Sequence, residues 1–327
     1  MLRVFHPSAP VSTIIDPQAS AALPADTVWI DLFDPTNVEE QFVERIIGHA
    51  IPTREEMAEI EPSSRLYEES GVLYLTATVL TGLASNDPIA SPISFVLTPK
   101  QLVTVRYTDP KPFLTFIDHV ARQPELLASA MQTFVRLLDA IVDRMADALE
   151  QIALELETIS KHVFRRSASE RGRRIPALKL EALLVRIGTT QDMLAKARET
   201  AGSTARLLTF VSSRPQFRGN PDQREELRSL AEDVDSLIDH SGFLAQNVVF
   251  LLDASLGLIN IEQNAIFKIF SVVSVMLLPP TLVGAIYGMN FDHMPELKWV
   301  FGYPLALLLM IASSILPYLY FRRRGWL

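Results

Sequence analysis

A row of residues, most of them polar or small, runs along one side of an apolar segment near the C-terminus. Its members recur at alternating steps of three and four residues: Asn264, Phe267, Ser271, Ser274, Leu278, Thr281, Ala285 and Gly288. This spacing places them on one face of a helix, while the other faces carry Ile, Val, Met, Leu and Phe. In an apolar surrounding, a hydroxyl group needs a partner helix or water. This polar seam therefore predicts either a wet path between helices or a face for helix packing.

Two further features of this segment bear on that choice. Gly284 and Gly288 have the small-xxx-small spacing that lets helix backbones pack closely. Pro279 and Pro280 leave two backbone carbonyls without helical donors, which favours a hinged helix that lines a pore. The spacing alone leaves both interpretations open.

The sequence contains no motif of a known type of enzyme. None of the six histidines forms His-Glu-x-x-His or another pair at ligand spacing, and there is no Gly-x-x-x-x-Gly-Lys phosphate loop. The absence of cysteine excludes disulfides, thiolate metal sites and cysteine nucleophiles. A formal net charge of -8 argues against nucleic acid as a partner. We therefore expect no catalytic residue and no organic cofactor.

Two uncharged segments, residues 269–287 and residues 301–321, are long enough to cross a bilayer, which takes roughly 20 residues. Arg322, Arg323 and Arg324 follow the second segment directly, so the positive-inside rule places the C-terminus in the cytoplasm. The N-terminus carries no signal-peptide pattern. We expect a multi-pass protein with both termini cytoplasmic, a periplasmic loop at residues 288–300 and a basic tail at residues 322–327.

The residues before the first membrane segment divide into three parts. Short apolar runs predict strands, among them a buried strand at residues 28–32 and a hairpin over residues 93–107. Because helical stretches lie between the strands, we expect a cytoplasmic α/β domain over residues 1–124. Apolar residues at helical spacing predict a helical hairpin over residues 125–221. Its basic tip, residues 161–174, is either a solvated turn or a binding patch. Residues 222–268 have no proline and predict a stalk helix that continues into the bilayer.

The outer end of the first membrane segment carries Tyr287-Gly288-Met289-Asn290, and Met294-Pro295-Glu296-Leu297 follows in the loop. Both motifs resemble the CorA family of magnesium/cobalt transporters. Similar matches occur at Pro279-Pro280-Thr281-Leu282-Val283, at Gly302-Tyr303-Pro304 and at Pro317-Tyr318-Leu319-Tyr320-Phe321. The resemblance is dense in the C-terminal part of the chain and fainter in the N-terminal domain.

This resemblance implies a homopentameric funnel in the bacterial inner membrane, with the helices of residues 269–287 around the pore. It implies transport of Mg²⁺, with Co²⁺ and Ni²⁺ as further ions. Gly288, Met289 and Asn290 would form the selectivity filter, beside the loop residues Asp292 and Glu296. The pore-lining residues that it implies are Asn264, Phe267, Ser271, Ser274, Leu278 and Thr281, with Asp253 as an acidic ring.

The resemblance also implies that intracellular Mg²⁺ regulates the pore by binding acidic residues between neighbouring cytoplasmic domains. Acids are abundant in two stretches. Residues 31–69 hold eleven Asp and Glu against three Arg, and residues 225–239 hold six against one Arg. We expect Asp233 and Asp235 to belong to the regulatory site.

Two alternatives stay open. The first is a Zn²⁺ transporter of the same superfamily, although such transporters commonly depart from the Gly-Met-Asn and Met-Pro-Glu-Leu motifs. The second is a non-conducting, membrane-tethered sensor or scaffold, which would need neither a polar seam nor an amide at the mouth of a pore.

Overall fold

The computed structural model describes residues 1–8, 12–20, 22–82, 88–169, 177–217, 219, 221–289, 294–295 and 299–326. They fall into two compact units. The first comprises Met1–Arg165 and Val185–Leu251, and the second comprises Arg166–Leu184 and Leu252–Leu327. Each unit is described by itself.

A seven-stranded sheet forms the N-terminal part of the first unit, in the order β2-β1-β3-β7-β6-β5-β4. Every neighbouring pair is antiparallel except β3 and β7, which are parallel. The strands are β1 (Leu2–Phe5), β2 (Thr13–Ile14), β3 (Trp29–Phe33), β4 (Leu66–Glu69), β5 (Val72–Thr81), β6 (Ile89–Leu97) and β7 (Leu102–Arg106).

Eight α-helices accompany the sheet among the described residues. They are α1 (Asn37–Ile47), α2 (Arg54–Ala58), α3 (Pro62–Arg65), α4 (Lys111–Arg122), α5 (Ala130–Ser169), α6 (Ala177–Ser212), α7 (Pro221–Tyr287) and α8 (Gly302–Arg323). Local sequence explains where the first two begin. Thr36 and Thr53 each cap a helix N-terminus in a capping box with the glutamate three residues later.

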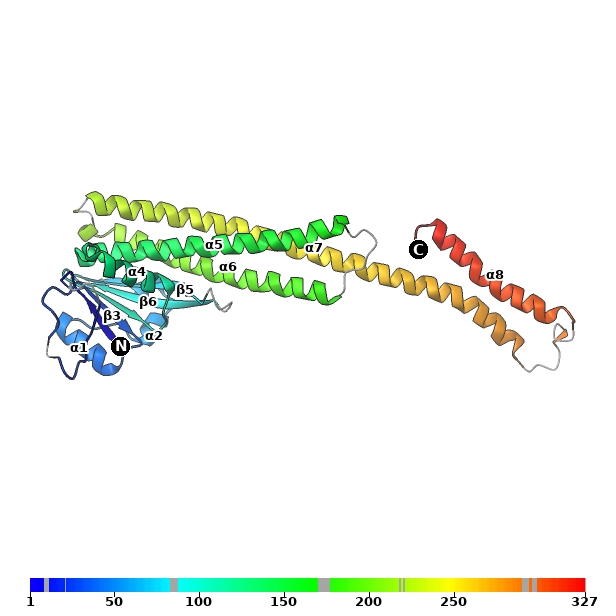
Figure 1. The fold of residues 1–327 in the computed structure, drawn as a ribbon, viewed down its shortest axis with the longest axis horizontal. Helices are drawn as coiled ribbons and strands as arrows, with labels where there is room; N and C mark the ends of the chain where they lie inside the picture. The colour runs from blue at the N-terminus through cyan, green and yellow to red at the C-terminus, as the bar shows by residue number, and fades with distance from the viewer. Residues whose placement is uncertain are drawn as a thin grey trace. The chain divides into compact units, whose positions relative to one another are not determined.

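The sheet separates two hydrophobic cores. Along β5, alternate side chains point to opposite faces, so Leu73 and Leu75 join one core while Val72 and Tyr74 join the other. Helices α1 and α2 cover one face, and α4 with the long helices covers the other (Figure 1). The unit is therefore a three-layer α/β structure.

The long helices pack on one another through buried residues at helical spacing. On α5 these include Phe134, Leu138, Ile141 and Met145, and the same core takes in Val234 of α7. In Figure 1, α5, α6 and the first half of α7 run side by side.

The second unit contains the end of α7 and helix α8, which turns back alongside it (Figure 1). Each of these helices has an apolar window long enough to cross a membrane, and almost none of either window is buried. A core helix of a soluble protein would be covered on most sides, so the exposed apolar surface fits lipid.

The observed fold matches the expected fold class, with an N-terminal α/β domain, long helices and two apolar C-terminal helices. The strand expected at residues 28–32 is β3, and the expected hairpin at residues 93–107 is formed by β6 and β7. Strands β1, β2 and β4 and helix α4 were not expected. The side chains of residues 165–174, which make up most of the basic tip at residues 161–174, are not described.

Candidate pore face and acidic clusters

The polar seam lies on the exposed side of α7. Asn264, Ser271, Ser274 and Thr281 are all exposed, and Phe267 and Leu278 are 67% and 66% exposed. From Ser271 to Tyr287, the less exposed residues of α7 are Val272, Met276, Pro279, Pro280, Val283, Gly284 and Tyr287. On a helical wheel their mean direction is about half a turn away from the seam. The seam therefore faces away from the covered side of α7.

Helix α8 contacts α7 away from the seam. A Cβ atom added to Gly284 would meet Met310 Cε of α8 at 3.2 Å. At the other end of the pair, Lys268 Nζ lies 5.9 Å from the centre of the Trp326 ring, in a cation–π contact. Gly284 thus serves close helix packing within the chain, whereas the hydroxyl groups of the seam do not face α8.

Thr281 stands next to the two prolines of α7. Because Pro279 and Pro280 have no N–H, the carbonyls of Val275 and Met276 lose their helical donors. The Thr281 hydroxyl donates to the carbonyl oxygen of Leu277 at 2.7 Å. Its proton is therefore engaged, and its oxygen is left as an acceptor on the exposed seam. An acceptor at this position suits the water shell of a cation.

Asp253 extends the seam beyond the membrane segment. It is exposed, and it lies 11 residues before Asn264, so the two side chains point in directions about 20° apart around the helix. The structure therefore brings Asp253, Asn264, Ser271, Ser274, Leu278 and Thr281 onto one face.

The end of α7 carries the first two residues of the expected filter. The Gly288 N–H donates to the carbonyl of Gly284 at 3.0 Å, and a Cβ atom on Gly288 would lie 3.0 Å from that same oxygen. Any side chain there would press on the last turn. Met289 is 45% exposed. Asn290, Asp292 and Glu296 lie outside the described residues.

The two expected regulatory residues are not brought together within one chain. Asp233 and Asp235 are both exposed on α7, but two residues correspond to about 200° around a helix. Asp233 lies near carboxylates of α5. Burial raises the pKa of Asp139 on α5, and the charges of Asp143, Glu226 and Asp233 raise it further, against Arg136, which lowers it.

Asp139 was not anticipated from the sequence, because its acidic neighbours on α7 follow it by some ninety residues. Among the described residues, no three His, Asp or Glu side chains converge in an arrangement that could hold a metal ion. The Asp139 cluster is thus a region of carboxylate repulsion within one chain.

Asp139→Asn is expected to raise the thermal stability of the protein at neutral pH. Since the folded state raises the pKa of Asp139, it binds that proton more tightly than the unfolded chain does, and stability falls as pH rises through the folded pKa. The gain in Tm should therefore be present at pH 7 and disappear near pH 3.9 and below, about the unfolded pKa. Thermal unfolding at several pH values, with exposed Asp118→Asn as the control, checks this. An unchanged Tm at pH 7 would show that the repulsion is screened.

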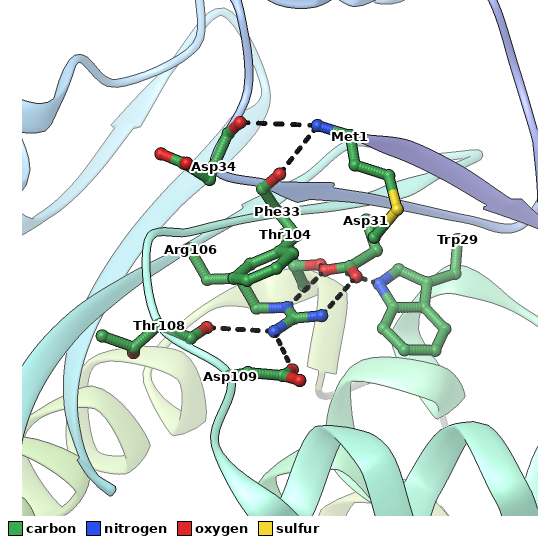
Figure 2. A network of polar contacts seen from close by, with 9 residues as sticks. All are labelled: Met1, Trp29, Asp31, Phe33, Asp34, Thr104, Arg106, Thr108 and Asp109. Carbon is green, nitrogen blue, oxygen red and sulfur yellow. Dashed lines mark hydrogen bonds and ion pairs between the residues drawn. The ribbon is translucent and has the colours of Figure 1, made fainter.

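Asp31 is a different case, because it is fully buried and paired. Its carboxylate accepts from Arg106 Nε at 3.0 Å and from Arg106 Nη2 at 2.9 Å, and also from the Thr104 hydroxyl at 2.8 Å (Figure 2). Arg106 is also fully buried, and Asp109 and the carbonyl of Thr108 accept from its Nη1.

The Arg106 guanidinium lies 4.6 Å from the centre of the Phe33 ring and 5.0 Å from that of Phe113. Burial alone would lower the pKa of Arg106, but the carboxylates of Asp31 and Asp109 outweigh it and raise the pKa. The buried Arg106 is therefore charged, and the carboxylate of Asp31 is hydrogen-bonded to it.

Several of the abundant acids in residues 31–69 have partners within the chain. Asp31 is held by Arg106, and Glu39 by the N-terminal ammonium at 3.0 Å. Three more acids of this stretch also have structural partners: Glu44 accepts from the Ile51 N–H, Glu56 caps α2, and Glu68 pairs with Arg214. These five acids therefore make contacts within the chain.

Known proteins resemble this chain over its whole length. Residues 24–323 match the family model described as CorA-like Mg²⁺ transporter protein. The magnesium transport protein CorA of Salmonella typhimurium and that of Escherichia coli strain K12 are each 34% identical to the chain over 327 residues, covering 100% of the chain and 100% of each relative.

Solved structures share the fold. The CorA magnesium transporter of Methanocaldococcus jannaschii has a TM-score of 0.77 at 19% identity, over 100% of this chain and 98% of its own. The cytoplasmic domain of ZntB from Vibrio parahaemolyticus has a TM-score of 0.53 at 10% identity, over 78% of this chain and 96% of its own. By its sequence, the chain therefore belongs to the family of CorA-like Mg²⁺ transporter proteins, which are transporters and not enzymes.

Proposed function

We propose that this chain assembles as a homopentamer in the bacterial inner membrane and conducts Mg²⁺ through a pore lined by the polar seam of α7. The observation that carries the proposal is the direction of the seam. Its hydroxyl and amide groups face away from the covered side of α7, and they belong to a helix apolar enough to cross a membrane. Such groups need water or a partner in the bilayer, and a ring of identical helices provides both.

The proposed filter is a ring of Asn290 side chains at the mouth of the pore. Mg²⁺ gives up its water reluctantly and prefers oxygen ligands in octahedral geometry. Neutral amide oxygens can accept hydrogen bonds from the water shell and still release the ion. Gly288 supports this filter because a side chain there would press on the last turn of α7.

Below the filter, the ion would pass acceptors and one apolar constriction. The oxygen of Thr281 is free to accept from a hydrated ion because its proton is donated to Leu277. Leu278, one turn further, is the proposed constriction, which closes by excluding water. Asp253 would attract cations at the cytoplasmic end of the seam.

Ion flux into liposomes that contain the purified protein tests this proposal. Mg²⁺, Co²⁺ and Ni²⁺ should enter, and Zn²⁺ should not be the preferred ion. Preference for Zn²⁺ would favour the alternative of a zinc transporter. The similarity to the ZntB domain does not favour that alternative, because at 10% identity the two proteins share only the fold. No flux of any divalent cation would favour a membrane-tethered sensor or scaffold.

Both termini are proposed to be cytoplasmic, from the three arginines after α8. The chain has no cysteine, so single cysteines can be introduced without removing any. Cysteine at Asp292 should react with an impermeant thiol reagent from outside the cell, whereas cysteine at Ser20 should react only after lysis. The reverse pattern of labelling would rule out this orientation.

Intracellular Mg²⁺ is proposed to close the pore by neutralising carboxylates crowded between neighbouring chains. Unscreened carboxylates about 4 Å apart repel by roughly 1 kcal/mol in water and by several at a lower effective dielectric. We expect millimolar Mg²⁺ to protect residues 222–268 from protease and to lower flux. Asp233→Asn should weaken the effect of Mg²⁺ more than Asp235→Asn, because only Asp233 adjoins the Asp139 cluster.

The parent protein decides whether this sensor exists. If protection and flux are the same at micromolar and millimolar Mg²⁺, then the regulatory proposal is wrong and the pore proposal is unaffected. If Asp235→Asn has the larger effect, the site lies on the other side of α7.

A further inference from the structure

A cavity of about 360 Å³ lies between the sheet and α6, in the first unit. Arg65 at the end of α3 and Arg206 on α6 line it, together with the buried hydroxyls of Thr76 and Ser203. Ile60, Pro62 and Leu66 form its apolar wall. Among the described residues that line this cavity, none carries a carboxylate. It is separate from the polar seam and from the Asp139 cluster.

The guanidinium of Arg65 is only partly satisfied by the protein. Its Nη2 donates to the Thr78 hydroxyl at 3.0 Å, which fixes the side chain at one edge. Its Nε is buried, and no described residue accepts from it. A buried N–H of a cation without an acceptor is costly, so this group is suited to a ligand that brings an acceptor.

Two more donors converge on the same space. The Ser203 oxygen accepts from the Thr78 N–H at 3.0 Å, which leaves the proton of the Ser203 hydroxyl available to donate. Arg206 is exposed at the cavity. No described residue forms a hydrogen bond or an ion pair with it. Arg65 and Arg206 thus face one cavity with several free N–H donors between them.

The charge of Arg206 disfavours the charge of Arg65. Burial and the nearby charge of Arg206 lower the pKa of Arg65, and Glu199 only partly compensates. Glu199 is exposed and does not line the cavity. An anion placed between the two guanidinium groups would remove this repulsion.

We propose that this cavity is a binding site for a phosphate-bearing anion, held by Arg65, Arg206 and Ser203. A phosphate dianion matches two positive charges, and its oxygens accept the paired N–H donors of a guanidinium. The cavity is large enough for more than a phosphate group, and its apolar wall can cover an organic part of the ligand. The bound anion would bridge the sheet to α6.

Calorimetric titration of the purified full-length protein tests this site. The probes are inorganic phosphate and ATP, each in Mg²⁺-free buffer at constant ionic strength. We expect one saturable site per chain for which the two probes compete. Tighter binding of ATP would identify an organic phosphate as the ligand, and equal binding would identify free phosphate; both outcomes support the site.

Arg206→Gln is the decisive variant, because exposed Arg206 has no structural partner among the described residues and its loss should leave the fold intact. Loss of one charge-assisted contact should weaken binding about ten- to a hundredfold. Arg198→Gln makes the same change of charge at an exposed position of α6 outside the cavity, and should bind like the parent. Arg206→Lys should weaken binding less than Arg206→Gln does, since it keeps the charge. No saturable binding by the parent, or equal binding by Arg206→Gln, would overturn the proposal.

Discussion

Asp31→Asn is expected to destabilise the cytoplasmic domain by about 3–5 kcal/mol, because it leaves the charge of a fully buried arginine without its main partner. The amide keeps the shape of the carboxylate but carries no charge, and its NH₂ group would face the donors of Arg106. Asp109 remains as a partner, but its side chain is 42% exposed and cannot replace the carboxylate. Thermal unfolding should show a fall in Tm on the order of 10 °C.

Two further variants separate loss of the ion pair from loss of any acid. Asp34→Asn removes an exposed carboxylate three residues away, at a position with φ of 43° that asparagine tolerates, so its Tm should stay close to that of the parent. Asp31→Leu combined with Arg106→Met removes both charges and should recover much of the lost stability. If Asp31→Asn melts like the parent, the buried pair contributes little to folding.

The position of Asp31 illustrates what the sequence alone could not reveal. The run of apolar residues around it predicted a buried strand, and β3 confirms that strand. The partner of Asp31 follows 75 residues later, on β7, through the one parallel pairing in the sheet. No local spacing connects two such strands, so in the sequence Asp31 is only one of the eleven acids of residues 31–69. Burial of a carboxylate becomes visible only once the strand order is known.

The polar seam was easier to anticipate, because it depends on the geometry of a single helix. A step of three and four residues places side chains on one face wherever the helix lies. Which side packs on α8 was not predictable, since that depends on how the chain returns after residue 289. The structure places Gly284 against Met310, which gives the small-xxx-small spacing a role within the chain. Seam and packing face are thus two different sides of α7.

The donors of the phosphate cavity were missed for the same reason as Asp31. Arg65 and Arg206 belong to segments far apart in the sequence, and each alone looks like an ordinary surface cation. The missing signal is the absence of a carboxylate between them, which only the folded chain can reveal.

Thr281→Phe is expected to lower Mg²⁺ flux by at least about tenfold without preventing assembly, because it would place an aromatic ring into the proposed pore from every chain of the ring. The change also removes an acceptor oxygen and the hydrogen bond to the carbonyl of Leu277, beside the two prolines. Flux into liposomes, together with the oligomeric state in detergent, measures both effects.

The matched control introduces the same ring at an exposed position of the other apolar helix. Leu308 is 64% exposed and belongs to α8, which does not carry the seam. Leu308→Phe therefore adds the same aromatic group outside the seam and should leave most of the flux. If Thr281→Phe transports like the parent, or if both variants lose flux equally, the seam is a packing face and the ion takes another path.

If Thr281→Phe prevents assembly, Thr281→Val provides the second test, because it removes the acceptor oxygen with little change in volume. A pore lining predicts that Thr281→Val reduces flux through an intact pentamer. A packing face predicts that its flux is normal.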